Sequence, residues 1–113
     1  MDTAGKEVLV FGLGISGIGA GSLLEKRGAR VVLYDGNEKL DKDKIREQLG
    51  EDSSARIITG PFPEELLGEL DLVVLSPGVP TDLPVIEKMR ELGLEIIRAL
   101  EHASLFGSGE IMD

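Results

Sequence analysis

Three short segments of this 113-residue sequence carry residue types that could bind an anion, and the first is rich in glycine. It is a Gly-x-Gly-x-x-Gly match over residues 12–17, between an apolar run and a segment with helical spacing. That context gives the motif its meaning. Gly12 would allow a tight turn, Gly14 would let the backbone approach a phosphate, and Gly17 would bring the helix close to the strand. The N–H groups of the first helical turn would then bind the anion.

Two side chains inside this motif have more than one interpretation. Ser16 places a hydroxyl in the first helical turn, where it could reach a phosphate or bond to nearby backbone. Ile15 is expected to pack, with a ligand base as one possible partner. The alternative for the whole motif is a turn that serves only close packing. The strand-turn-helix context favours anion binding at Gly14, Ile15, Ser16 and Gly17.

The second segment is Asp35-Gly36, at the end of the next apolar run and 18 residues beyond Gly17. In a dinucleotide site a carboxylate at this place accepts hydrogen bonds from a ribose, and it could equally accept an N–H from the edge of a base. Asp-Gly is also a common turn pair, so a surface turn is the alternative. Position alone does not choose the ligand.

The third segment, Ser76-Pro77-Gly78, follows the fourth apolar run. It offers a hydroxyl and exposed N–H groups, which favours a phosphate contact beside the glycine motif. A rigid turn with a purely structural role is the alternative.

The elements that must position these segments alternate between strand and helix. Apolar runs predict strands at residues 8–11, 31–34, 55–59, 72–75 and 95–98. Helices are expected from the glycine motif to Gly28, at 38–49, briefly at 63–67, from a cap at Thr81 or Asp82 to Gly93, and for a turn or two within 100–106. This order predicts an α/β Rossmann-like three-layer sandwich with a five-stranded parallel sheet. Ligands of such sheets bind beyond the carboxyl ends of the strands, where all three segments lie.

The inward faces of two helices follow from their spacing. In the helix at 38–49, Leu40, Ile45 and Leu49 form the apolar stripe. In the helix that ends at Gly93, the residues spaced for the inward face are Val85, Met89 and Leu92.

Composition restricts the class of protein. Hydrophobic residues make up 42% and charged residues 29% of the chain, as in an ordinary folded domain. The net charge of −9 argues against a nucleic-acid partner. The absence of cysteine excludes disulfides and thiolate chemistry, and no apolar run reaches the ~20 residues of a membrane span, so we expect a cytoplasmic protein without a membrane partner. No spacing of His, Asp and Glu indicates a metal site, and the single histidine, His102, receives no role.

Taken together, these segments resemble the N-terminal domain of the bacterial Mur ligases, in particular the type that adds D-glutamate to UDP-N-acetylmuramoyl-L-alanine in peptidoglycan precursor synthesis. The resemblance extends from Val8 to about Phe106. The segments that carry it are the glycine motif, Tyr34-Asp35, residues 75–80 and, more loosely, Glu95-Ile96-Ile97 followed by Glu101. The pairing of the glycine motif with Ser-Pro-Gly is its most discriminating part.

The resemblance implies a site for the uridine diphosphate part of that substrate. It places Ile15 and Ser16 at the uridine and phosphates, and Asp35 at the uracil. It places Ser76, Pro77 and Gly78 along the diphosphate and the sugar. One departure is Gly36, where the family often has threonine or another polar residue, so this chain has no side chain there to meet the base.

The resemblance also implies what lies outside these residues. Family members continue into an ATPase domain that opens on a P-loop and then into a third domain, and this chain has no such loop. We therefore expect a binding domain at residues 1–106 and a linker, or the start of the missing ATPase domain, at 107–113. ATP and Mg²⁺ would serve the full-length ligase, and the fragment alone would not catalyse. Two alternatives remain open, the NAD-binding domain of an oxidoreductase and a noncatalytic nucleotide-sensing module.

Overall fold

The computed structural model describes residues 4–80 and 82–98, apart from the side chains of Ile15 and Ser16. Strands and helices alternate along the chain as the sequence predicts. They are β1 (Glu7–Phe11), α1 (Ile15–Lys26), β2 (Arg30–Asp35), α2 (Lys42–Leu49), β3 (Arg56–Thr59), the 3₁₀ helix η1 (Glu64–Gly68), β4 (Leu72–Leu75), α3 (Pro84–Glu91) and β5 (Glu95–Arg98).

The five strands form one parallel sheet in the order β3-β2-β1-β4-β5. This confirms the predicted α/β Rossmann-like three-layer sandwich. The chain builds outward from β1 through β2 to β3 and then returns to the other side of β1, so the order reverses between β1 and β4. Phe11 pairs with Tyr34 on one side and with Leu75 on the other, so β1, β2 and β4 end near the same level. A ligand crevice is expected at this reversal.

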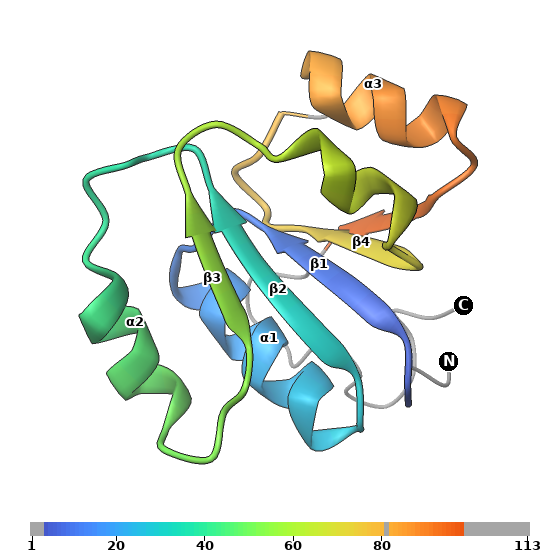
Figure 1. Cartoon of the computed structure of the whole chain (residues 1–113). Coiled ribbons are helices and arrows are strands. Elements are labelled where there is room, and N and C mark those ends of the chain that lie inside the picture. The colour runs from blue at the N-terminus through green and yellow to red at the C-terminus, as the bar shows by residue number, and fades with distance from the viewer. Residues whose placement is uncertain (1–3, 81, 99–113) are drawn as a thin grey trace.

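Helices cover both faces of the sheet (Figure 1). On one face, α1 and α2 pack on alternate residues of the strands, such as Val8 and Val10. On the other face, η1 and α3 pack on the intervening residues, such as Leu9 and Phe11. Both sides of β1 are therefore buried, which explains its nearly continuous apolar sequence.

The small residues of α1 allow it to lie close to β2. A Cβ placed on Gly21 would come within 2.6 Å of Leu33 Cδ2, so a larger residue at this crossing would force the Leu33 side chain to move. The helix ends in a turn at Gly28, which has a φ of 91°. Close packing, the compensation expected for the low intrinsic helicity of this segment, occurs at Gly21, whereas a Cβ on Gly19 would meet nothing within 4 Å.

The second helix begins later than predicted. Residues 38–41 are not helical, because α2 starts at Lys42 behind an Asp41 cap. The Asp41 carboxylate accepts the N–H groups of Asp43 and Lys44 at 3.0 and 3.3 Å. Those groups would lack a partner at the start of a helix, and the cap supplies one.

The third helix also differs from the prediction in its cap and its face. Its N-cap is Leu83, without a side-chain hydrogen bond, rather than Asp82. Ile86 and Met89 are buried, whereas Leu92 is 57% exposed. The predicted stripe is wrong at Leu92, which is the C-cap residue that follows the last helical residue, Glu91. The predicted cap at Thr81, the helix within 100–106, the linker at 107–113, Glu101 and His102 lie outside the described residues.

Candidate functional site

The glycine motif forms a turn locked against its neighbours. Gly12 has a φ of 102°, in the left-handed region that favours glycine, and its N–H donates to the Tyr34 carbonyl at 2.7 Å. A Cβ on Gly12 would lie 2.7 Å from Val79 Cγ2, and one on Gly17 would lie 2.0 Å from the Gly12 oxygen. These two glycines are therefore required by the fold itself.

Gly14 is different, because nothing in the protein requires it to lack a side chain. Its φ of −77° suits any residue, and a Cβ there would have no neighbour within 4 Å. It is the N-cap of α1 and provides no side-chain cap for the first turn. The first N–H groups of α1 therefore have no side-chain cap, and the space beside the Gly14 Cα is open, as an anion site at a helix N-terminus requires.

Ser76 joins the glycine turn to the loop that follows β4. Its N–H donates to the Phe11 carbonyl at 3.0 Å, and its hydroxyl donates to the Gly12 carbonyl at 2.6 Å. The side chain is buried, with 8% exposed. The hydroxyl proton is already used, so Ser76 can offer a ligand only the lone pairs of its oxygen.

Residues 76–79 form a tight turn, called here the Pro-Gly turn, in which the Ser76 carbonyl accepts the Val79 N–H at 3.0 Å. A side chain at Gly78 would meet nothing within 4 Å, so this side of the turn is open. From the end of β5, the Arg98 guanidinium donates to the carbonyls of Ser76, Pro77 and Val79. Sequence reasoning missed Arg98, because only the pairing of β4 with β5 brings it to this turn.

Asp35 lies at the end of β2 and is half-buried. One carboxylate oxygen accepts the Leu13 N–H at 2.9 Å, and the other accepts the Asn37 N–H at 2.8 Å. A carboxylate can accept about four hydrogen bonds, so acceptor capacity remains for a ligand. The Asp35 side chain thus fixes the glycine turn through Leu13 and also places a hydrogen-bond acceptor at the carboxyl edge of the sheet.

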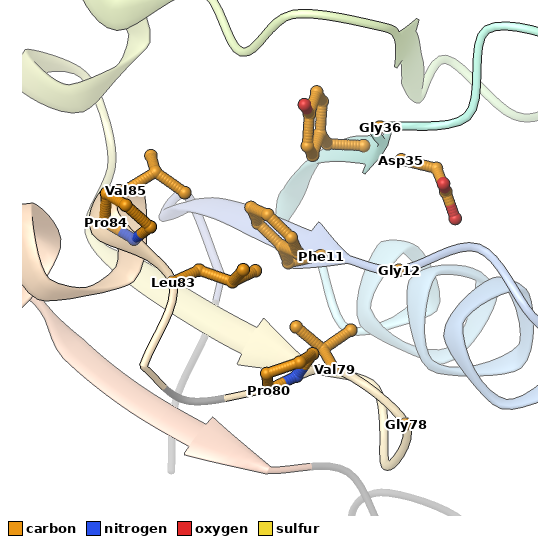
Figure 2. A pocket seen from close by; sticks show the side chains of 11 residues that line it. Phe11, Gly12, Asp35, Gly36, Gly78, Val79, Pro80, Leu83, Pro84 and Val85 are labelled. Carbon is orange, nitrogen blue, oxygen red and sulfur yellow. The ribbon is translucent and has the colours of Figure 1, made fainter.

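A cavity of about 510 Å³ opens beside these loops. Gly12, Asp35, Gly36 and Gly78 line it together with apolar residues, namely Phe11, Tyr34, Val79, Pro80, Leu83, Pro84 and Val85. Figure 2 shows Phe11, Val79 and Leu83 grouped around the space, with Asp35 to one side. Apolar walls beside a single carboxylate suit a flat heterocycle that carries an N–H donor.

Aromatic side chains support the floor of this cavity. The Tyr34 ring lies 4.9 Å from that of Phe11 and 5.0 Å from that of Phe62, the latter edge to face. The Tyr34 hydroxyl donates to the Gly60 carbonyl, a buried bond that ties β2 to the end of β3. Burial raises the pKa of Tyr34, and the neighbouring Asp35 carboxylate raises it further.

The predicted site residues therefore fall into two groups at one edge of the sheet. Asp35, Gly36 and Gly78 line the cavity, whereas Gly14 and Gly17 lie in the first turn of α1 beside it, as do the backbones of Ile15 and Ser16. Ser76 links the glycine turn to the loop after β4 through its bond to the Gly12 carbonyl, and Pro77 follows it in the Pro-Gly turn. Among residues 4–80 and 82–98, no cluster of metal-ligating side chains occurs. No helix in that part of the chain is long and apolar enough to cross a membrane.

The parallel sheet, the open helix N-terminus at the strand-order reversal and the adjoining cavity define a Rossmann-like nucleotide-binding domain. Residues 6–98 match the family model described as "Mur ligase MurD-like, N-terminal domain". The chain belongs to this family, as the resemblance in its sequence predicts.

Two relatives are UDP-N-acetylmuramoylalanine--D-glutamate ligases. The protein from Lachnospira eligens is 49% identical over 112 residues, which cover 99% of this chain and 25% of the relative. That from Lachnoclostridium phytofermentans is 46% identical over 98% of this chain and 24% of the relative. The chain thus spans about a quarter of the length of these ligases.

Among solved structures, a 3-hydroxyacyl-CoA dehydrogenase from Archaeoglobus fulgidus is similar in fold. Its TM-score is 0.62 and its identity 26%, over 96% of this chain and 39% of the dehydrogenase. The same sheet architecture therefore serves proteins with different names and reactions, and the ligand must be argued from the site.

Proposed function

We propose that this chain is the domain of a D-glutamate-adding Mur ligase that binds the uridine diphosphate part of UDP-N-acetylmuramoyl-L-alanine. The family match over residues 6–98 is the observation that carries this proposal. It is supported by 49% identity to a ligase of that name.

The diphosphate would lie over the first turn of α1. Its oxygens would accept the N–H groups of Ile15, Ser16 and Gly17, and Gly14 would leave room for their approach. The Pro-Gly turn would contribute a further N–H from the opposite side of the crevice, at Gly78. The chain has a net charge of −9, so we do not expect a basic patch to hold the phosphates. Backbone N–H groups can bind them without lysine or arginine side chains.

The uracil would enter the apolar cavity next to Asp35. The carboxylate has acceptor capacity beyond its bonds to Leu13 and Asn37, and an N–H at the edge of the base would use it. Gly36 lines the same cavity without a side chain. This chain therefore has no side chain at that position to contact the base.

In the full-length ligase this domain would tether and orient the substrate. ATP would phosphorylate the substrate carboxylate and leave ADP, and the D-glutamate nitrogen would attack the acyl phosphate to form the amide, with release of phosphate. The described residues lack a metal-ligand cluster, and the sequence lacks a P-loop, so they do not fit ATP and Mg²⁺. We assign those groups to other domains of the ligase. The contribution of this one is proximity and orientation.

Titration of the ¹⁵N-labelled chain with UDP and, separately, with NAD tests this proposal. We expect UDP to shift the amide signals of residues 14–17, Asp35 and Gly78, with weaker or no shifts from NAD. Shifts at residues 14–17 with NAD and none with UDP would support the oxidoreductase alternative and overturn the proposal.

Asp35→Ala should weaken UDP binding about tenfold, the loss expected when a hydrogen bond to a charged group disappears. Asp71→Ala is the matched control. Its carboxylate accepts the Glu7 N–H at 2.9 Å, a bond of the same kind at the opposite edge of the sheet. Calorimetry should show unchanged affinity in this control. Equal affinity in a folded Asp35→Ala variant would remove Asp35 from the site.

A further inference from the structure

We propose that Arg98 is a positioning residue of the anion site, because it holds the Pro77–Gly78 peptide in the orientation that presents the Gly78 N–H to the crevice. This inference rests on the proposed function in one respect, namely that the ligand carries phosphate. The conformation of the turn itself can be tested without any ligand.

The Pro-Gly turn does not have the conformation that its sequence favours. Proline followed by glycine at the two central positions is typical of a type II turn, in which the glycine has a φ near +80°. Gly78 is not among the positive-φ glycines of the described chain. Proline at the first central position excludes the mirror-image turns, because its φ is fixed near −65°. With the Ser76 carbonyl bonded to the Val79 N–H, the turn is type I.

Types I and II differ by a flip of the central peptide, here the one that joins Pro77 to Gly78. In a planar trans peptide the carbonyl and the N–H point to opposite sides. The flip therefore exchanges the directions of the Pro77 oxygen and the Gly78 N–H. Whatever fixes the oxygen also fixes the donor.

Arg98 fixes that oxygen. Its guanidinium donates to the Pro77 carbonyl at 2.8 Å, and to the carbonyls of Ser76 and Val79 at 3.3 and 3.2 Å. A flip would break the shortest of these bonds. A guanidinium has five N–H groups in a rigid fork, which suits it to three carbonyls arranged around one turn.

Strand order sets the side to which the Gly78 N–H points. Arg98 pairs with Leu75 from β5, the outer neighbour of β4, whereas β1 and its glycine turn lie on the inner side. With the Pro77 oxygen held toward β5, the Gly78 N–H points away from β5, in the direction of β1. The bond from the Ser76 hydroxyl to the Gly12 carbonyl places the two turns side by side there.

Within the described part of the chain, Gly78 carries the one backbone donor of residues 76–79 that has no acceptor. The Ser76 N–H donates to Phe11, the Val79 N–H closes the turn, and proline has no N–H. The orientation of this single peptide therefore decides whether the loop after β4 offers a ligand a donor or a carbonyl oxygen. A carbonyl oxygen in that place would repel a phosphate.

The first test is NMR on the free 113-residue chain. A strong NOE between the Pro77 Hα and the Gly78 amide proton marks a type II turn. We expect it to be weak in the native chain and strong in Arg98→Met, with a change in the coupling constant that reports φ at Gly78. Arg56→Met is the control, since Arg56 is an exposed arginine at the amino end of β3 and its loss changes the net charge equally. An unchanged turn in Arg98→Met would overturn the inference.

The second test compares UDP with uridine, which lacks phosphate. Arg98→Met should raise the dissociation constant for UDP about tenfold and leave that for uridine within about twofold, because a misdirected hydrogen bond to a charged group costs this much. Arg98→Lys should give a mixture of turn types and an intermediate affinity, since one ammonium cannot replace the fork. Full recovery in Arg98→Lys, or equal losses for UDP and uridine, would contradict the positioning role. Failure of the native chain to bind UDP would reject the proposed function and leave the NOE result to decide on Arg98.

Discussion

The glycines at the carboxyl edge of the sheet lack side chains for different reasons. Gly12 and Gly17 are required by the protein, since added methyl groups would collide with Val79 and with the Gly12 carbonyl. Gly14 and Gly78 have open space around them and φ angles outside the left-handed region. The fold does not require these two glycines, which agrees with the proposal that a ligand approaches the backbone there.

Alanine substitutions should therefore separate folding from binding. We expect Gly12→Ala and Gly17→Ala to lower the free energy of unfolding by about 2 kcal/mol or more, through strain at Gly12 and overpacking at both. Gly14→Ala should stay within about 1 kcal/mol of the native stability. It should nevertheless weaken UDP binding, because its methyl group occupies the path of the phosphate.

Urea unfolding and calorimetry measure the two quantities independently. A Gly14→Ala variant that binds UDP as tightly as the native chain would show that the phosphate does not approach the backbone at this residue. Stable Gly12→Ala or Gly17→Ala variants would show that the turn can move aside, contrary to the packing described.

Residue types predicted the glycine turn and Asp35, because both lie within one strand-helix-strand unit and their spacing is local. The bonds of Ser76 and Arg98 could not be predicted in the same way. Each depends on which strands become neighbours, and the sequence does not state that β4 inserts between β1 and β5. The type I conformation of a Pro-Gly pair is a further case, since tertiary bonds override the local preference.

At the level of elements, apolar runs predicted β4 and β5 to the residue, because each run ends at polar or turn residues. Helix boundaries were less accurate. Charged residues 38–41 fit a helix by composition, yet the Asp41 side chain caps the chain four residues later than expected. A few side-chain hydrogen bonds decide whether the helix begins at a cap or extends further toward the N-terminus. The periodicity of apolar residues does not reveal these bonds.

The link between β2 and β3 through Tyr34 predicts a change of stability at alkaline pH. The folded pKa of Tyr34 is raised above the value of 10.0 of a free tyrosine, so the folded state keeps its proton after the unfolded state has lost it. The stabilisation is complete below that unfolded pKa and is lost as pH rises through the higher folded pKa. We expect the native chain to lose stability above about pH 10.

Tyr34→Phe isolates the contribution of the Tyr34 hydroxyl to this change of stability with pH. The variant should be less stable than the native chain at neutral pH by about 1 kcal/mol, since the Gly60 carbonyl loses its donor. Its disadvantage should shrink as pH rises past 10, which urea unfolding at stepped pH values would measure. A constant difference between the two proteins from pH 8 to 11 would contradict a raised pKa for Tyr34.

At the scale of the whole molecule, an anion would bind here to a protein with a net charge of −9. The attraction comes from aligned N–H groups over a short range, whereas the repulsion comes from the entire chain over a longer one. Salt screens the long-range repulsion first. We therefore expect the affinity for UDP to hold or increase between about 20 and 200 mM NaCl, within which the Debye length falls below about 10 Å.

Calorimetry in a salt series measures this dependence, and uridine serves as the uncharged control. A steep loss of UDP affinity with salt would indicate a cluster of basic side chains at the site instead of backbone donors. In that case the assignment of the phosphates to α1 and Gly78 would be wrong.

The hydroxyl bond from Ser76 to Gly12 spans 64 positions of the chain. This bond between the two turns of the site forms only after β4 has docked against β1, a contact that closes a long loop and is costly in entropy. A folding intermediate made of β1, α1 and β2 alone would have an incomplete crevice. Since a ligand that binds only the completed fold stabilises it by mass action, UDP should slow unfolding more than it speeds the earliest steps of folding. Binding of UDP would then report that β4 and β5 have docked against β1, β2 and β3.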